Sequence, residues 1–292
     1  MPPIRIGAAL DVADLPRYRD WLIADQRDLE IQDFHVTDVL LGDWEDRAAT
    51  ARAALDGFEG RLGIHGPFVN VPISCNDPEL RPIVTNRYLT GLRAAIAVGA
   101  SQMVIHSPFT IWDDKNYGDK PGRGNDPSHK DSIIAACHEV MAPVVRQAED
   151  HGVTLVIENC DDVSPLDRLD LARSFSSAAV KVSIDTGHAH NAHCAQGAVP
   201  VDYFIVAAGE WLAHVHLQDT DGFAPPPSEV ERPVVDIHPD ELIRLAPVEP
   251  PAELQGVVER VLPVFEAVLD ALLQQVVDPL DDVRPQVLAD RV

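Results

Sequence analysis

Apolar and polar positions follow two different rhythms along the chain. Short runs of β-branched and other apolar residues predict buried strands, and longer segments with an apolar residue every three or four positions predict amphipathic helices. The expected strands are residues 4–10, 29–35, 62–68, 102–107, 154–160, 180–186, 212–219 and, with a weaker pattern, 254–261. The clearest helices between them are residues 15–26, 80–98, 131–150 and 200–209.

Strands and helices in this order are typical of βα units around a parallel sheet. Eight strands in 292 residues predict an α/β fold, a closed (β/α)8 TIM barrel formed as one domain over residues 1–292. Residues 112–128, rich in Gly, Asp, Asn and Pro, predict a loop after the fourth strand. The last quarter is atypical, because the proline-rich residues 223–251 predict an irregular segment before the last strand and a C-terminal helix.

The chain contains 23 Lys and Arg against 47 Asp and Glu, which gives a formal net charge of −24. Phosphate backbones and anionic lipids repel so acidic a protein, so we expect neither nucleic acid nor a membrane as a partner. The apolar runs are shorter than the roughly 20 residues of a membrane helix, and residues 1–10 lack the apolar centre of a signal peptide. Four cysteines without a CxxC pair suit a reducing compartment, and the expected location is cytoplasmic.

Ionisable residues lie inside or at the end of five strongly apolar strands. They are His65, His106, Glu158, Asp185 and His216. A buried charge is costly unless a hydrogen bond, an opposite charge or a metal compensates it. Because the carboxyl ends of barrel strands meet at one rim, we expect the five side chains to lie close together. Three imidazoles and two carboxylates are ligands that Zn²⁺, Mn²⁺, Fe²⁺ and Co²⁺ accept.

Each of these residues also has a simpler interpretation. A histidine at a barrel rim can bond to the backbone, and a buried glutamate can belong to a structural ion pair. His214 and His216 share one face of a strand, so one of them could be a ligand and the other its orienting partner. The chain has no GxSxG, GxxxxGK[ST], GxGxxG or HExxH motif, which removes the usual sequence support for several other chemistries.

Five motifs in order along the chain resemble one known group of proteins. They are IHGPF at 64–68, IHSPF at 105–109, VIEN at 156–159, IDTGH at 184–188 and HVHLQD at 214–219. The chain thereby resembles the xylose-isomerase-like barrels, which include sugar isomerases, sugar epimerases and apurinic endonucleases of the endonuclease-four type. The resemblance implies that Glu158, Asp185 and His216 bind a divalent metal such as Mn, Zn, Co or Mg. It also implies that His188 binds substrate or a second metal.

The same resemblance implies roles for further residues. His65 and His106 match positions that line the sugar pocket of the isomerases and bind an additional metal in the endonucleases. In the last quarter the usual glycine turn is missing. There Asp236 and His238 resemble an Asp-x-His pair of the endonucleases, which makes them candidates to bind an additional metal or to support its ligands. Glu259 is the glutamate that resembles the metal-binding end of an eighth strand, and the resemblance makes it a further candidate metal ligand. His214 is a further candidate as a ligand or orienting partner.

These observations favour a metal-dependent isomerase or epimerase of a sugar or sugar phosphate, working through an enediolate or a hydride shift. Glu158 and Glu259 are then the expected bases, and Phe109 and Trp112 an apolar wall of the substrate site. One alternative is an apurinic-endonuclease-like phosphodiesterase with a metal cluster, and another is a barrel whose site has decayed. The expected partner is a small sugar, and a homo-oligomer stays possible. The sequence leaves open the sugar, its phosphorylation and the metal.

Overall fold

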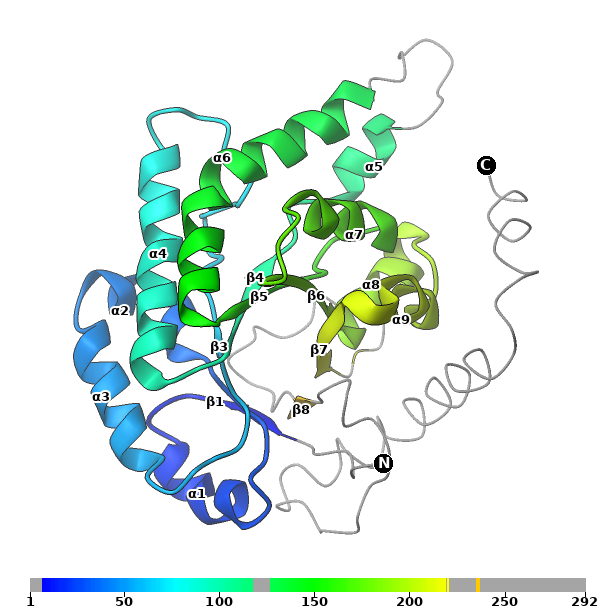
Figure 1. The fold of residues 1–292 in the computed structure, drawn as a ribbon. Coiled ribbons are helices and arrows are strands. Elements are labelled where there is room, and N and C mark those ends of the chain that lie inside the picture. Colours follow the sequence, from blue (N-terminus) through cyan, green and yellow to red (C-terminus); the bar gives the residue numbers. More distant parts are fainter. Residues whose placement is uncertain (1–6, 118–126, 219, 221–234, 237–292) are drawn as a thin grey trace. The chain divides into compact units, whose positions relative to one another are not determined.

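A computed structural model describes residues 7–117, 127–218, 220 and 235–236 (Figure 1). Within these residues, seven parallel strands follow one another in chain order and curl into a half-barrel. They are β1 (Ala8–Leu10), β2 (Leu29–Ile31), β3 (Leu62–His65), β4 (Gln102–His106), β5 (Thr154–Glu158), β6 (Val180–Asp185) and β7 (Leu212–Leu217). The short β8 (Val235–Asp236) pairs antiparallel with β7 and also contacts β1. The predicted TIM barrel architecture is therefore confirmed.

Helices connect these strands and cover the outer face of the sheet (Figure 1). In chain order they are α1 (Leu15–Ala24), η1 (Asp33–His35), α2 (Thr37–Leu41), α3 (Trp44–Ala54), α4 (Arg81–Val98), α5 (Ile111–Tyr117), α6 (Pro127–His151), α7 (Pro165–Ser174), α8 (Thr186–Gln196), α9 (Val201–Ala208) and η2 (Gly209–Trp211). The helices predicted at 15–26, 80–98, 131–150 and 200–209 correspond to α1, α4, α6 and α9. None of the helices in the described residues is long and apolar enough to cross a membrane.

The strands are apolar because both faces of the sheet are buried. Ile64, Val104, Val156 and Ile184 have no exposed surface. Strands covered on both sides tolerate few polar residues in their interior, so the ionisable side chains that do occur there must be compensated by their neighbours. Burial on both faces therefore explains the sequence pattern of these strands, which is an apolar run with one polar residue near its end.

Two predicted segments differ from the structure. Residues 29–35 are not one strand, because β2 ends at Ile31 and the 3-10 helix η1 follows. Residues 112–128 are not a loop throughout, because α5 covers Ile111–Tyr117 and α6 begins at Pro127. The start of α5 is a reciprocal cap: the Asp113 carboxylate accepts hydrogen bonds from the backbone N–H and hydroxyl of Thr110 at 2.9 and 2.7 Å. This cap stabilises a helix within a segment whose composition resembles a loop.

Several predictions for the last quarter lie outside the described residues. These are the strand at 254–261, the C-terminal helix and, apart from β8, the irregular segment 223–251. The prediction of a single domain over residues 1–292 stays a prediction.

Candidate metal centre

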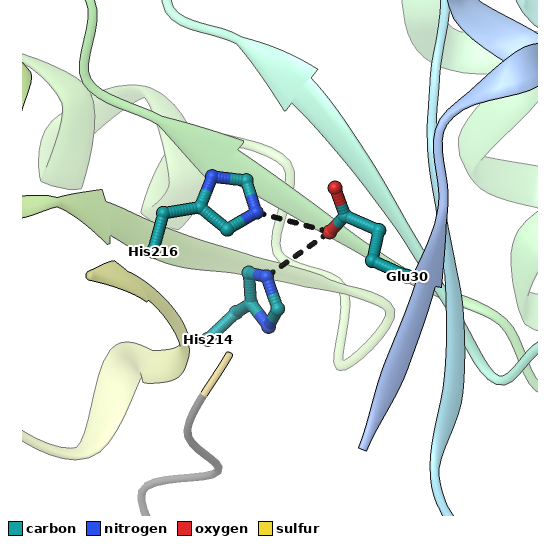
Figure 2. A group of neighbouring side chains, drawn as sticks. All are labelled: Glu30, His214 and His216. Carbon is teal, nitrogen blue, oxygen red and sulfur yellow. Dashed lines mark hydrogen bonds and ion pairs between the residues drawn. The ribbon is translucent and has the colours of Figure 1, made fainter. Parts of the chain in front are cut away.

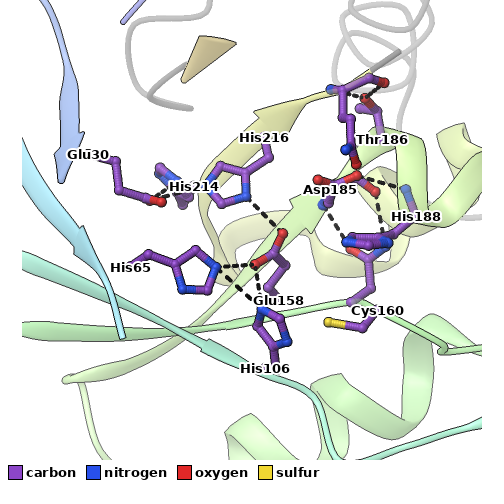
Figure 3. A network of polar contacts seen from close by, with 12 residues as sticks. Glu30, His65, His106, Glu158, Cys160, Asp185, Thr186, His188, His214 and His216 are labelled. Carbon is purple, nitrogen blue, oxygen red and sulfur yellow. Dashed lines mark hydrogen bonds and ion pairs between the residues drawn. The ribbon is translucent and has the colours of Figure 1, made fainter. Parts of the chain in front are cut away.

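The carboxyl ends of six neighbouring strands place ionisable side chains at one rim of the half-barrel (Figure 3). Backbone pairing sets His106 on β4 beside Glu158 on β5, and Asp185 on β6 beside His216 on β7. His65 ends β3, and Glu30 lies on β2. The five residues predicted from strand ends are thus brought together.

Glu158 occupies the centre of this group, with only 2% of its surface exposed. Its Oε1 lies 2.8 Å from His216 Nδ1, and its Oε2 lies 3.7 Å from Nε2 of both His65 and His106. Oε2 has no hydrogen-bond partner among the described residues. Burial opposes ionisation, but the imidazole of His216, followed by His106 and His65, holds the pKa of Glu158 well below its usual range. The carboxylate is therefore ionised, with one oxygen hydrogen-bonded and one not.

His65 and His106 direct ring nitrogens towards Glu158. His65 Nδ1 lies 2.9 Å from the carbonyl oxygen of Gly66 and must donate to it, so in the neutral ring Nε2 carries the lone pair. Nε2 of His106 lies 3.3 Å from this atom. Burial lowers the pKa of His106 to about 3, so its ring is neutral. A histidine that binds a cation through one ring nitrogen usually donates a hydrogen bond from the other, often to a backbone carbonyl. His65, whose Nδ1 donates to Gly66, has this arrangement.

A second group joins Glu158 to Asp185 and His188. One potential ligand atom from each of these three residues lies within 4.8 Å of the others, and the same holds for His65, His106 and Glu158. Asp185 also caps helix α8, because its Oδ1 accepts the backbone N–H of His188 at 2.7 Å. Burial raises the pKa of Asp185. β6 ends at Asp185 and α8 begins at the next residue, so His188 lies in the first turn of α8.

Buried polar contacts hold the end of β6 in place. The Asn159 side-chain oxygen accepts the Asp185 backbone N–H at 2.9 Å and Arg168 Nη1 at 2.8 Å, and its amide nitrogen donates to the Asp185 carbonyl at 3.0 Å. Gly187 packs against Gln218 so closely that an added Cβ would lie 2.9 Å from that side chain. The motif at 184–188 therefore requires its glycine, and the carboxylate of Asp185 has a fixed position.

Glu30 is a member of the site that the sequence reasoning missed. It has no exposed surface, and its Oε2 lies 3.1 Å from Nε2 of both His214 and His216 (Figure 2). Burial opposes the charge of His216, yet the carboxylates of Glu158 and Glu30 raise its pKa well above the usual value. The signal was available, because Glu30 is a carboxylate within an apolar strand, like Glu158.

The remaining predicted site residues lie in different surroundings. Phe109 is buried, whereas Trp112 on α5 is 66% exposed. The aromatic ring that stacks on His106 is Phe68, with ring centroids 4.1 Å apart, and the sequence reasoning missed it. Asp236 lies in β8 and pairs through its backbone with His216, but its side chain is outside the described residues, as are His238 and Glu259.

Comparison with known proteins gives a consistent picture of the fold. A model of the xylose isomerase-like TIM barrel family matches residues 26–237. No curated protein matches the sequence. Among solved structures, the TTHB071 protein from Thermus thermophilus, studied by soaking with ZnCl2, is 25% identical with a TM-score of 0.54, over 74% of this chain and 78% of that one.

Two further structures share the fold at lower identity. A D-tagatose 3-epimerase-like protein is 17% identical with a TM-score of 0.53, over 74% of this chain and 77% of that one. The D-psicose 3-epimerase from Clostridium cellulolyticum H10, solved with D-tagatose, is 17% identical with a TM-score of 0.51, over 72% and 71% of the two chains.

Proposed function

The chain belongs to the xylose isomerase-like TIM barrel family, and on this basis we propose that it is a divalent-metal-dependent isomerase or epimerase of a sugar or sugar phosphate. The observation that carries the proposal is the buried group of Glu158, Asp185 and His188, together with the 2.8 Å contact between Glu158 and His216. Structural neighbours described as sugar epimerases support the reaction class.

The side chains fit a divalent cation. Carboxylate oxygens and imidazole nitrogens from neighbouring strand ends form a mixed donor set suited to Zn²⁺, Mn²⁺ or Co²⁺. One potential ligand atom from each of Glu158, Asp185 and His188 lies within 4.8 Å of the others, which is close enough for one ion to contact all three residues. Glu158, Asp185, His216 and, on the outer side, His188 would hold the ion. When bound, the ion supplies Lewis-acid polarisation of a substrate carbonyl.

The protein side chains have distinct tasks in the proposed reaction. Glu158 Oε2 accepts the proton from the carbon next to the substrate carbonyl, because it is ionised and has no competing hydrogen bond among the described residues. Nε2 of His65 and His106, which face this oxygen, position a substrate hydroxyl beside it. Phe68, stacked on His106, limits the approach of water from that side. The second base proposed from the sequence, Glu259, lies outside the described residues.

The proposal is tested by metal analysis and by proton exchange. The purified protein should contain about one divalent ion per chain. With a panel of ketoses and aldoses in D₂O, NMR should detect deuterium at a carbon next to the carbonyl. Glu158→Gln should lower the exchange rate by about 10²-fold or more, and Glu79→Gln, the same change at an exposed position, should leave it unaltered. Absence of a bound ion, or full activity of Glu158→Gln, would refute the proposal.

A metal-dependent phosphodiesterase is the second candidate. The group of His65, His106 and Glu158 favours it, because these side chains offer ligand atoms for an additional ion. The formal net charge of −24 opposes binding to nucleic acid. About three ions per chain, together with cleavage of DNA that contains an abasic site and no sugar exchange, would favour this candidate over the isomerase.

A further inference from the structure

Three further side chains lie beyond His216, on the side away from Glu158: Glu30 and His214 are buried, and the Arg61 side chain is 16% exposed. We call Glu30, Arg61, His214 and His216 the Glu30 cluster. Figures 2 and 3 show Glu30, His214 and His216. Only His216 belongs to the ligand set of the proposed function. The other three are polar or charged side chains placed behind a candidate ligand, and their contacts with one another and with His216 need a physical explanation.

Arg61 determines the protonation of His214. Arg61 Nη2 lies 3.2 Å from His214 Nδ1. A guanidinium has only donors, so Nδ1 must accept this hydrogen bond and the proton of the neutral ring must be on Nε2. His214 Nε2 lies 3.1 Å from Glu30 Oε2, as an ion-pair contact. Arg61 is itself fixed, since it also pairs with Asp28 at 2.7 Å and donates to Gln102 at 2.8 Å.

Both carboxylate oxygens of Glu30 accept a hydrogen bond. Its Oε2 accepts from His216 Nε2 at 3.1 Å and faces His214 Nε2 at the same distance, and its Oε1 accepts from Gln32 Nε2 at 2.7 Å. The carboxylate is therefore an acceptor with a fixed direction, and it keeps a proton on His216 Nε2.

The same contacts argue against a metal ion within the Glu30 cluster. Glu30, His214 and His216 could supply three ligand atoms by distance alone. Ligation by His214 Nε2 would move the ring proton to Nδ1, where it would meet an N–H of Arg61 at 3.2 Å. Two donors facing each other at this distance are unfavourable, and Arg61 cannot lose its proton. The cluster therefore suits orientation of a ligand and not ligation of its own ion.

We propose that Glu30 is a positioning residue that keeps the Nε2–H of His216 directed at itself, so that Nδ1 is the atom presented to the metal beside Glu158. The inference rests on the proposed function for the presence of the ion, but the ring orientation is a property of the metal-free chain as well. Carboxylates that hold the second nitrogen of a ligating histidine fix its tautomer and strengthen its binding. Here His214 and Arg61 in turn hold the carboxylate.

The test compares Glu30→Gln with the wild type in two measurements. The first is ¹⁵N–¹H NMR of histidine side chains in the metal-free and Zn²⁺-loaded protein, with His216 assigned from the spectrum of His216→Asn. The wild type should show a slowly exchanging proton on His216 Nε2, and Glu30→Gln should lose or strongly shift it. The second is Zn²⁺ titration by calorimetry, in which Glu30→Gln should raise Kd by about 10- to 100-fold at unchanged stoichiometry. Glu79→Gln is the matched control.

Three outcomes would overturn the inference. One is an Nε2 proton that persists unchanged in Glu30→Gln with the same Zn²⁺ affinity. Another is the loss of one whole Zn²⁺ equivalent in both Glu30→Gln and His214→Asn, because the cluster would then bind its own ion. If the wild type binds no Zn²⁺, the proposed function fails separately, and the metal-free spectra still decide: loss of the proton in Glu30→Gln supports the inference and its persistence overturns it. Should Glu30→Gln not fold, Glu30→Asp serves for the same measurements.

Discussion

The two oxygens of Glu158 face two very different regions of the same rim. Oε1 faces His216 of the Glu30 cluster, whose Nε2 donates to Glu30 on the other side of the ring. Every member of that cluster has a charged or polar partner. Oε2 faces His65 and His106, whose nitrogens lie 3.7 Å away without a hydrogen bond to it. We call the side of Oε1, with His216 and the Glu30 cluster, the closed side, because its side chains are hydrogen-bonded or ion-paired to one another. We call the side of Oε2, with His65 and His106, the open side, because these side chains make no hydrogen bond to Oε2.

The difference shows how a buried carboxylate can serve structure and chemistry at the same time. A closed network gives its members fixed positions, and removal of one member leaves a buried charge without a partner. An open region loses less when a side chain is removed, because His65 and His106 make no hydrogen bond to Glu158 Oε2. Stability measurements should therefore separate the two sides of Glu158, with the largest losses on the closed side and the smallest on the open side.

The largest loss is expected on the closed side. In the metal-free protein, His216→Leu leaves Glu158 and Glu30, which are 2% and 0% exposed, without the imidazole between them. Breaking a buried charge pair in this way costs about 3–5 kcal/mol. Urea unfolding in the presence of EDTA measures the free energy of unfolding. His151→Leu, at an exposed position on α6, should change it by less than about 0.5 kcal/mol.

A double variant sharpens this prediction. Adding Glu30→Gln to His216→Leu removes one of the two unpaired charges, so the double variant should recover part of the lost stability. If His216→Leu destabilised the protein no more than His151→Leu does, the closed network would not contribute to stability and the comparison would be wrong.

The sequence predicted much of this arrangement because its signals are local. A polar residue at the end of an apolar run identifies His65, His106, Glu158, Asp185 and His216, and the convergence of strand ends in a barrel brings them together. Glu30 escaped because residues 29–35 were interpreted as one long strand, although β2 contains only three residues. The closed network could not be predicted, since the contact between Arg61 and His214 joins residues 153 positions apart. Only the packed structure reveals such a pair.

Capping carboxylates start both α5 and α8, and local composition misled the prediction for α5. The segment 112–128 was predicted as a loop from its Gly, Asp and Asn content, but the reciprocal cap of Thr110 and Asp113 starts a helix there. The Asp185 cap similarly starts α8, and it places His188 in the first turn of that helix. In both cases one carboxylate near the start of a segment outweighs the average propensity of the residues that follow.

A smaller effect on the free energy of unfolding is expected from another buried carboxylate, Asp162. It tests whether a buried carboxylate needs charged partners to be stable in its ionised form. Its oxygens accept from the Ser107 hydroxyl at 2.8 Å and the Cys160 N–H at 3.2 Å, both neutral donors. Burial, only partly offset by Arg168, raises the pKa of Asp162 from 3.8 to about 6. Because the native state holds the proton more tightly, this contribution to stability is complete below about pH 4 and is lost as the pH rises through about 6.

The measurement is urea unfolding of the wild type and Asp162→Asn between pH 4 and 7. Asparagine cannot ionise, so the stability of the variant relative to the wild type should increase over this range by up to about 3 kcal/mol. The exposed Asp150→Asn should show a nearly constant difference from the wild type. A constant difference for Asp162→Asn as well would mean that neutral donors suffice to stabilise a buried carboxylate, as the imidazoles do for Glu158.

The smallest change in stability is expected on the open side, at His106. Its ring is neutral in the metal-free protein and stacks on Phe68. Its Nε2 lies 3.3 Å from His65 Nε2 and 3.7 Å from Glu158 Oε2, without a hydrogen bond to that oxygen. A leucine of similar volume should therefore change the free energy of unfolding by less than about 1 kcal/mol. If His106 positions a substrate hydroxyl, His106→Leu should raise KM about tenfold through the lost hydrogen bond and leave the Zn²⁺ stoichiometry unchanged. Loss of one Zn²⁺ equivalent in His106→Leu would instead assign the open side to a second ion, because Oε2 of Glu158 would then face a cation and not a substrate.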